Sequence, residues 1–227
     1  MSDVPTNDVL VVVAAGPGLG RSVALRFARE GYAVGLVARS PDALADLVAE
    51  VGAAGAPAVA VAPADVSDDA ALRGALGELA STLGPAAVVV YNGSAYVEGS
   101  VTALPPDRLR LALNVGVVGA LVTAQETVPA MRAAGRGTVV LTGSVAADRA
   151  STSAAAVGVA KAALRNLALS LHKELAPDGV RAVTVTIAGV LSGPKALDVE
   201  EIADLYWQLH SSAEPPEGVV VFPHLTT

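Results

Sequence analysis

The sequence predicts an α/β protein with one doubly wound, mostly parallel sheet of seven strands. Short apolar runs rich in β-branched residues alternate with helical segments along all 227 residues. Runs such as DVLVVVAA at 8–15 are apolar at nearly every position, which is typical of parallel strands that helices cover on both faces. No linker or low-complexity tract interrupts the alternation, so residues 1–227 are expected to form a single domain, with 1–7 as a flexible tail.

Seven strands and six helical segments are expected, with right-handed βαβ crossovers joining them and strand order 3-2-1-4-5-6-7. The expected strands span 8–15, 32–38, 57–64, 86–91, 137–143, 180–189 and 218–223. The expected helices lie near 19–30, 41–54, 68–83, 106–134, 152–176 and 198–211.

The composition excludes several classes of function. The chain is 52% hydrophobic and 16% charged, which indicates a large buried core. A net charge of −7 argues against a general nucleic-acid surface. The absence of cysteine removes disulfides and thiol nucleophiles, and three scattered histidines give no metal-ligand spacing, so no metal is implied.

The N-terminal residues carry acidic side chains where a signal peptide needs basic ones. The apolar stretch Leu111–Ala124 is interrupted by Asn114 and is too short to span a bilayer. We therefore expect a soluble cytoplasmic protein with no membrane partner.

The turn between the first strand and the first helix is rich in glycine. It reads AAGPGLG at 14–20, with Gly16, Gly18 and Gly20 around Leu19. Glycines here allow the backbone to turn tightly and approach a pyrophosphate, which the helix N-terminus then holds. The alternative is a turn that needs glycine only for its backbone angles. Its position between a strand and a helix favours a nucleotide.

The second strand ends in Ala38-Arg39-Ser40. An acidic residue here would bind the ribose hydroxyls of NAD, whereas an arginine suits the 2′-phosphate of NADP. Arg39 and Ser40 thus predict NADP(H) in preference to NAD(H). The alternative for Arg39 is an ordinary exposed charge before a helix.

With these motifs the chain resembles the short-chain dehydrogenase/reductase family, whose first turn usually reads T-G-x-x-x-G-x-G. Gly18 and Gly20 match its last two glycines, and Val13-Ala14 replaces the leading Thr-Gly. The resemblance implies that Asp65 and Val66 contact the adenine ring, although Asp65 is also placed to cap the next helix.

The fourth strand ends in Tyr91-Asn92-Gly93-Ser94, where the family usually has Asn-Asn-Ala-Gly. The resemblance implies that Asn92 lines the cofactor's ribose. The other three positions differ from the family's pattern.

The family's catalytic spacing is Ser, twelve residues, Tyr, three residues, Lys. Ser144 and Lys161 have this separation, but the tyrosine position is Val157, and the wider spacing of the family's enoyl reductases falls on Ala154. Asn114, in LALNVGVVGALVTA, matches the family's asparagine and is expected to be buried, with helix–helix hydrogen bonding as the alternative to a water relay. Ser144, Lys161 and Asn114 are the candidate catalytic residues; without a phenol, Lys161 keeps the implied role of holding the nicotinamide ribose.

Tyr96 is a candidate substitute acid, or simply an aromatic of the pocket wall. The resemblance implies hydride transfer between NADP(H) and a carbonyl or alcohol, in a homodimer or homotetramer. Two alternatives stay open: a nucleotide-binding pseudoenzyme, which Val157 favours, and a lyase or isomerase with Lys161 as base. Tyr206 and His210 have the i, i+4 spacing of an amphipathic helix face.

Overall fold

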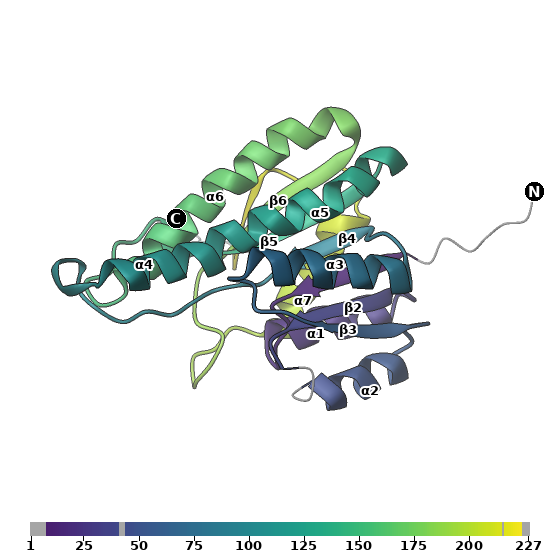
Figure 1. Cartoon of the computed structure of the whole chain (residues 1–227), viewed down its shortest axis with the longest axis horizontal. Coiled ribbons are helices and arrows are strands. Elements are labelled where there is room, and N and C mark those ends of the chain that lie inside the picture. The colour runs from purple at the N-terminus through teal and green to yellow at the C-terminus, as the bar shows by residue number, and fades with distance from the viewer. Residues whose placement is uncertain (1–7, 41–43, 215, 224–227) are drawn as a thin grey trace, which may run out of the picture.

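The computed structural model describes residues 8–40, 44–214 and 216–223 (Figure 1). They form one seven-stranded sheet in the order β3-β2-β1-β4-β5-β6-β7, and every strand pair is parallel. The predicted fold and strand order are confirmed. The tail expected at 1–7 lies outside the described residues, as do 41–43 at the start of the second expected helix.

The element bounds follow the sequence pattern closely. The strands are β1 Val9–Val13, β2 Ala33–Ala38, β3 Val59–Pro63, β4 Val88–Tyr91, β5 Gly137–Ser144, β6 Val180–Ile187 and β7 Val219–Phe222. The helices are α1 Leu19–Ala28, α2 Ala45–Ala53, α3 Asp69–Leu83, α4 Pro106–Leu113, α5 Gly119–Ala134, α6 Ala155–Leu175 and α7 Val199–Ser211.

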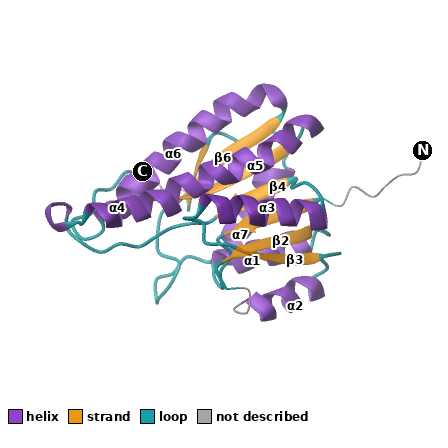
Figure 2. Cartoon of the chain, viewed as in Figure 1, coloured by secondary structure: helices purple, strands orange, loops and turns teal. Residues whose placement is uncertain are grey.

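Helices cover both faces of the sheet (Figure 2). One face packs against α3, α5 and α6, and the other packs against α1, α2 and α7. Successive residues of β1 enter the two cores in turn: Val9, Val11 and Val13 join one, while Leu10 and Val12 join the other. Every residue of β1 must therefore be apolar, which explains the uninterrupted hydrophobic run in the sequence.

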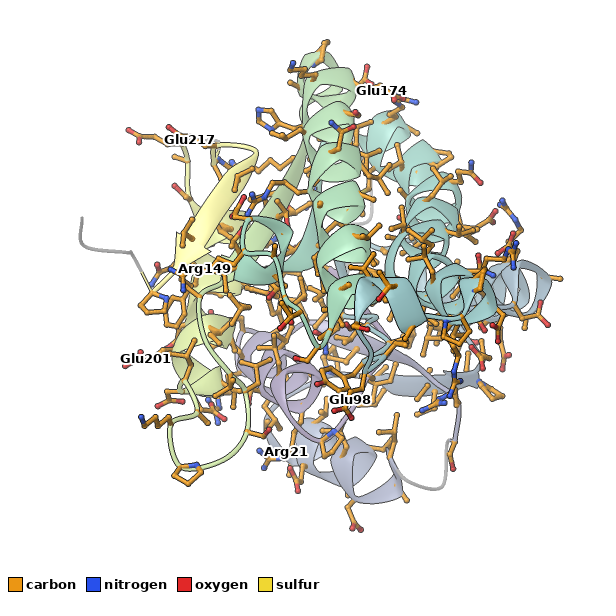
Figure 3. The ribbon with its side chains drawn as sticks, turned by 90° about the vertical axis from the view of Figure 1, so that its left-hand side faces the viewer. Arg21, Glu98, Arg149, Glu174, Glu201 and Glu217 are labelled. Carbon is orange, nitrogen blue, oxygen red and sulfur yellow. The ribbon has the colours of Figure 1, made fainter. Side chains whose placement is uncertain are left out.

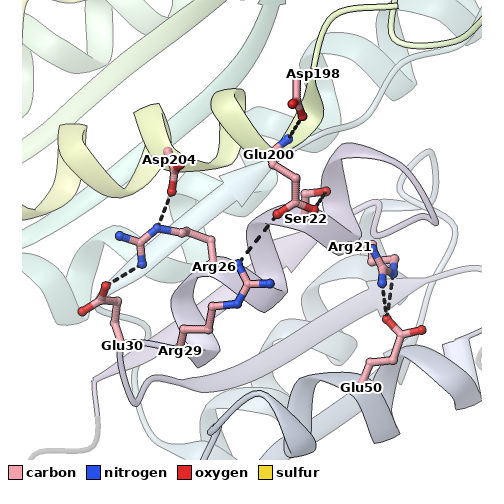
Figure 4. Close-up of polar contacts among 9 residues, drawn as sticks. All are labelled: Arg21, Ser22, Arg26, Arg29, Glu30, Glu50, Asp198, Glu200 and Asp204. Atoms are coloured by element: carbon pink, nitrogen blue, oxygen red, sulfur yellow. Dashed lines mark hydrogen bonds and ion pairs between the residues drawn. The ribbon is translucent and has the colours of Figure 1, made fainter.

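Ion pairs join α1 to α7 at the surface (Figure 4). Arg26 contacts Asp204 of α7 at 2.6 Å and Glu30, just past the end of α1, at 2.6 Å. The buried Ser22 hydroxyl donates to Glu200 at 3.1 Å. The contacts with Asp204 and Glu200 bridge elements far apart in the sequence, whereas the Glu30 contact is local. The ion pairs each stabilise the fold only slightly, by less than about 1 kcal/mol.

Helices α4 and α5 form one continuous rod, joined by the π-helical turn Asn114–Val118. The rod, Pro106–Ala134, is 29 residues long, and the mean hydropathy of its most apolar window is 1.4. It is thus longer than the apolar stretch from which the sequence argued against a bilayer span. Half of that window is buried inside the fold. Core helices share these properties, so length and hydropathy are weak evidence for a membrane span.

His210 of α7 joins a polar and aromatic cluster near the start of the sheet's strands. Its Nε2 lies 2.7 Å from the Tyr32 hydroxyl, and its Nδ1 lies 2.8 Å from the Thr138 hydroxyl. The rings of Phe27 and Trp207 pack edge to face, with centroids 5.2 Å apart, beside it. The i, i+4 spacing in the sequence thus marked a buried helix face, but its hydrogen bonds were not predicted.

Burial lowers the pKa of His210 to about 4, from 6.5 for an unperturbed histidine; Arg181 and Arg136 act in the same direction and Asp8 opposes them. Between these values the unfolded chain binds a proton that the folded chain excludes. The stability that this group contributes is therefore present above pH 6.5 and is lost as the pH falls toward 4. Because the ring is partly exposed, we expect its contribution to be roughly 1–2 kcal/mol.

Thermal unfolding between pH 4 and 7 tests this expectation. The melting temperature of the wild type should fall more steeply with acidification than that of His210→Gln, which keeps a donor and an acceptor but does not titrate. Parallel curves for the two proteins would contradict the assignment.

Candidate functional site

A cavity of about 450 Å³ lies at the carboxyl edge of the sheet, where the chain leaves β1, β2, β3 and β4. This is the point at which the strand order reverses on either side of β1, the usual ligand position in doubly wound sheets. Its walls are Ala14, Ala15, Ala38, Arg39, Ala64, Asp65, Val66, Ser67, Asn92, Gly93, Ser94, Ala95, Tyr96, Leu111 and Val115.

Backbone hydrogen bonds continue past the strand ends and fix these walls. The amide of Ala15 donates to the Val37 carbonyl of β2 at 2.9 Å. The amide of Asn92 donates to the Val13 carbonyl of β1 at 3.0 Å. The segments that follow β1 and β4 are thus held as extensions of the sheet.

Five predicted residues come together around this cavity: Arg39, Asp65, Val66, Asn92 and Tyr96. They follow three different strands, β2, β3 and β4. The rest of the predicted set does not line the cavity: Gly16, Gly18, Leu19, Gly20, Ser40, Asn114, Ser144 and Lys161.

The three glycines of the first turn have different surroundings. A Cβ on Gly20 would meet the Cα of Ala15 at 3.3 Å, so this glycine allows α1 to approach the turn closely. A Cβ on Gly16 or Gly18 would meet no atom of the described residues within 4 Å. Gly18 is the N-cap of α1 and has no side chain that could accept a hydrogen bond from the first amides of the helix. Such an N-terminus suits the binding of a phosphate. The Leu19 side chain is buried in the core, so only its backbone is available to a ligand.

Ala14 lines the cavity in a left-handed conformation, with φ of 59°. This conformation costs a residue with a Cβ about 1–2 kcal/mol, and glycine adopts it freely. Ala14 occupies the place of the first glycine in the motif T-G-x-x-x-G-x-G. Ala14 therefore adopts backbone angles that favour glycine, and the resulting backbone strain lies at the cavity wall.

The two arginines near the cavity differ in their contacts. Arg39 is exposed and lines the cavity beside Asp65, whose pKa its charge helps to lower. Arg21 donates instead to Glu50 of α2 at 2.7 Å, and Figure 3 shows it in the lower part of the molecule. Ser40 is exposed next to Arg39 but outside the cavity lining.

Asp65 shapes the segment after β3. Its carboxylate accepts the Ser67 amide at 2.9 Å and the Ser67 hydroxyl at 2.7 Å, and these hydrogen bonds hold the pKa of Asp65 below its usual range. The cap of α3 is Asp68, which accepts the amides of Ala70 and Ala71. The capping role considered for Asp65 therefore belongs to Asp68.

Lys161 is buried, with a relative exposure of 6%. Its Nζ donates to the carbonyl of Thr142 in β5 at 2.7 Å and lies 3.5 Å from the carbonyl of Gly93, a cavity residue. Desolvation lowers the pKa of Lys161 to about 8, so a neutral amine is accessible near physiological pH. Val157 lies one turn earlier on α6 and is half-buried.

Ser144 ends β5, and its Oγ accepts the Ala146 amide at 3.2 Å. The turn that follows it packs closely against α6. Gly158 of α6 lies so near that a Cβ on it would be 2.9 Å from the Ala146 carbonyl. Arg165 of α6 donates to the Asp148 carboxylate through both of its terminal nitrogens, with Nη2 at 2.8 Å. Ser144 is therefore held at the edge of the sheet with its hydroxyl proton still available to donate.

The expected burial of Asn114 is wrong. Its side chain is exposed, because α4 extends past the strands and Ala112 is the only buried residue of that helix (Figure 1). An exposed amide can bind water and needs no protein partner. Burial therefore supports neither the water relay nor the helix–helix hydrogen bond considered for Asn114. Asn114 nevertheless begins the π-helical turn, a feature common at functional sites.

Sequence reasoning missed Leu111 and Val115, which reach the cavity from the rod. Their i, i+4 spacing indicates a shared helix face, but nothing in the sequence distinguishes a cavity face from a core face. Tyr91 was also missed. It was noted only as a mismatch to the family's motif.

These features define a doubly wound α/β protein with a ligand cavity at the reversal of its strand order. A family model described as short chain dehydrogenase matches residues 8–200, so the chain belongs to the short-chain dehydrogenase family.

Relatives named as dehydrogenases and a solved oxidoreductase structure support this membership. The chain is 34% identical to 2-dehydro-3-deoxy-L-rhamnonate dehydrogenase (NAD(+)) of a Sphingomonas species, over 78% of this chain and 70% of that protein. It is 30% identical to meso-2,3-butanediol dehydrogenase of Serratia marcescens, over 97% of this chain and 88% of that one. A metagenomic short-chain oxidoreductase solved in complex with NADP superposes with a TM-score of 0.86 at 25% identity, covering 95% of this chain and 96% of that one.

Proposed function

We propose that this chain is an NADP(H)-dependent oxidoreductase that transfers hydride between the nicotinamide and a carbonyl or alcohol substrate. The observation that carries the proposal is the cavity at the strand-order reversal, with Arg39, Asp65 and Asn92 in its walls. The names of the relatives support dehydrogenase chemistry. They do not decide between the two cofactors, since one names NAD(+) and a solved relative binds NADP.

The residues of this chain fit a dinucleotide. Space beside Gly16 and Gly18 and the uncapped start of α1 suit the pyrophosphate. Asp65 and Val66 would flank the adenine, and Asn92 the ribose. Ala38 brings no carboxylate that would repel a 2′-phosphate, and Arg39 supplies a cation for it.

When bound, the nicotinamide supplies or accepts the hydride. Ser144 would orient the substrate oxygen with its hydroxyl, Lys161 would hold the ribose, and Asn114 would bind water at the exposed π turn. Val157 provides no proton at the position of the family's tyrosine. Among the four tyrosines, all of them described residues, only Tyr96 is exposed at the cavity, with 73% of its surface accessible, so it is the candidate acid.

A catalytically silent nucleotide-binding protein is the second candidate. Val157 favours it, and so does the hydrogen bond of Lys161 to the Thr142 carbonyl, which occupies part of the ammonium's donor capacity.

The cofactor preference predicts a selective effect of Arg39→Ala. Its removal should raise the dissociation constant for NADPH about tenfold, the cost of one exposed charge-assisted hydrogen bond, and leave that for NADH unchanged. Nucleotide fluorescence titration measures both constants. Arg21→Ala is the matched control, because Arg21 pairs with Glu50. A selective NADPH loss in Arg21→Ala, with none in Arg39→Ala, would reject the assignment.

Restoring a phenol tests the reaction. The wild type should oxidise NADPH with at least one member of a carbonyl panel, and Ser144→Ala should slow this at least about tenfold. Val157→Tyr should accelerate it at least about tenfold, because a placed general acid contributes about 10²–10⁴-fold.

Val157→Phe is the control for Val157→Tyr, since it adds the ring without the hydroxyl. Tight NADPH binding with no turnover by wild type or Val157→Tyr would defeat the enzyme proposal and favour the silent protein. Substrate conversion without a change in nicotinamide absorbance would indicate lyase or isomerase chemistry.

We also propose that the chain forms a homodimer or homotetramer through α5 and α6. Leu121 of α5 and Val159 of α6 are large apolar residues with 39% and 49% exposure. A groove of about 340 Å³ between these helices is lined by Leu121, Val128, Pro129 and Leu171, among others. Exposed apolar surface of this kind favours association.

Light scattering at micromolar concentration should give a dimer or tetramer mass, and Leu121→Glu should reduce it by placing a charge in the contact. Val101→Glu, which charges an exposed residue outside both helices, should not. A monomeric wild type would refute the proposal.

A further inference from the structure

Tyr91 is the last residue of β4 and is completely buried. It stands where the family usually has the first asparagine of Asn-Asn-Ala-Gly. Its hydroxyl donates to the backbone carbonyl of Val115, inside the π-helical turn Asn114–Val118. A strand residue therefore donates a hydrogen bond to a helix carbonyl at the π turn, where the α-helical hydrogen-bond pattern of the rod changes.

Glycines surround the phenol where it meets its neighbours. A Cβ on Gly93 would lie 2.6 Å from the Tyr91 hydroxyl. A Cβ on Gly119, the first residue of α5, would collide with the same hydroxyl and would lie 2.7 Å from the Val66 carbonyl. The phenol thus packs against Gly93 and Gly119, and Gly119 in turn packs against the Val66 carbonyl, with no room for a methyl group at either glycine.

Two backbone segments that contact Tyr91, and a third that Gly119 contacts, also form walls of the nucleotide cavity. Val66, Gly93 and Val115 all line it, although Tyr91 itself does not. Gly93 in addition offers its carbonyl to Lys161 at 3.5 Å. The phenol therefore lies directly behind the cavity.

We propose that Tyr91 is a positioning residue for nucleotide binding. Its hydroxyl holds the π turn of the rod against the segment that follows β4, and Gly119 at the end of that turn packs against the segment that follows β3, so that Val66, Gly93 and Val115 form one wall. The proposal rests on the proposed nucleotide-binding function, and it deepens it by assigning the geometry of the site to a buried residue that touches no ligand.

The hydroxyl is the essential part of this role. A phenylalanine would fill the same space between the glycines but would remove the hydroxyl that donates to the partly buried Val115 carbonyl, and losing such a donor costs free energy. Burial raises the pKa of Tyr91, and the charge of Asp65 raises it further, so the phenol stays protonated and remains a donor across the physiological pH range.

The experiment compares Tyr91→Phe with Tyr32→Phe. Both variants remove one hydroxyl from a tyrosine that is buried and hydrogen-bonded, but Tyr32 bonds His210 in the cluster near the strand starts, away from the cavity. Thermal unfolding measures the stability that each variant loses, so that a loss of affinity can be compared with a loss of stability. Tyr91→Phe should raise the dissociation constant for NADPH about tenfold, equivalent to about 1.4 kcal/mol, whereas Tyr32→Phe should leave it at the wild-type value.

Hydrogen exchange of the nucleotide-free proteins is the second measurement. Amides of residues 114–120 should exchange faster in Tyr91→Phe than in the wild type, and at the wild-type rate in Tyr32→Phe. Hydrogen exchange needs no ligand. If the wild type binds no nicotinamide nucleotide, the proposed function is rejected, but exchange still tests whether the Tyr91 hydroxyl stabilises the π turn.

Wild-type exchange at 114–120 in Tyr91→Phe would overturn the proposal. So would wild-type NADPH affinity in that variant, or an equal loss of affinity in both variants, because the effect would then follow stability alone.

Discussion

The structure depends on a parallel sheet whose two faces are both buried. Each strand alternates between two cores, as Val11 and Val12 of β1 do, so within the sheet nearly every side chain is apolar. A polar group there costs free energy unless it finds a partner, as the hydroxyls of Thr142 and Tyr206 do at 2.9 Å. Ligand-binding side chains are thereby restricted to the ends of the strands, and the reversal of strand order at β1 opens the space they line.

This restriction explains what the sequence could predict. Residues that directly follow an apolar run, such as Arg39, Asp65 and Asn92, must lie at the carboxyl edge whatever the details of the helices, and they line the cavity. Helical residues have no such restriction. The exposure of Asn114 depends on how far α4 extends past the strands, and the direction of the Lys161 side chain depends on carbonyls supplied by β5 and the segment after β4. Neither property is encoded in local periodicity.

Departures from a family pattern carried information that the matches did not. Ala14 keeps a left-handed conformation although it has a Cβ, so the turn is imposed by its surroundings rather than by its own preference. Tyr91 replaces an asparagine and fills the space left by Gly93 and Gly119. Agreement with the family motif alone would score both residues as mismatches. In the structure, Ala14 forms part of the cavity wall in a left-handed conformation, and Tyr91 makes a specific hydrogen bond behind that wall.

The two edges of the sheet use buried polar groups in opposite ways. Near the strand starts, His210 has partners on both ring nitrogens, and Arg181 donates to the carbonyls of Leu209 and His210 at the end of α7. That network fixes the helix to the sheet. At the carboxyl edge, Lys161 is buried without a carboxylate partner among the residues that the structure describes, and burial lowers its pKa. An ammonium held by carbonyl dipoles can lose its proton without breaking an ion pair, so proton exchange is less costly at this edge than the depth of burial suggests. Lys161, the buried group that can change its protonation state near physiological pH, therefore lies at the same edge of the sheet as the cavity.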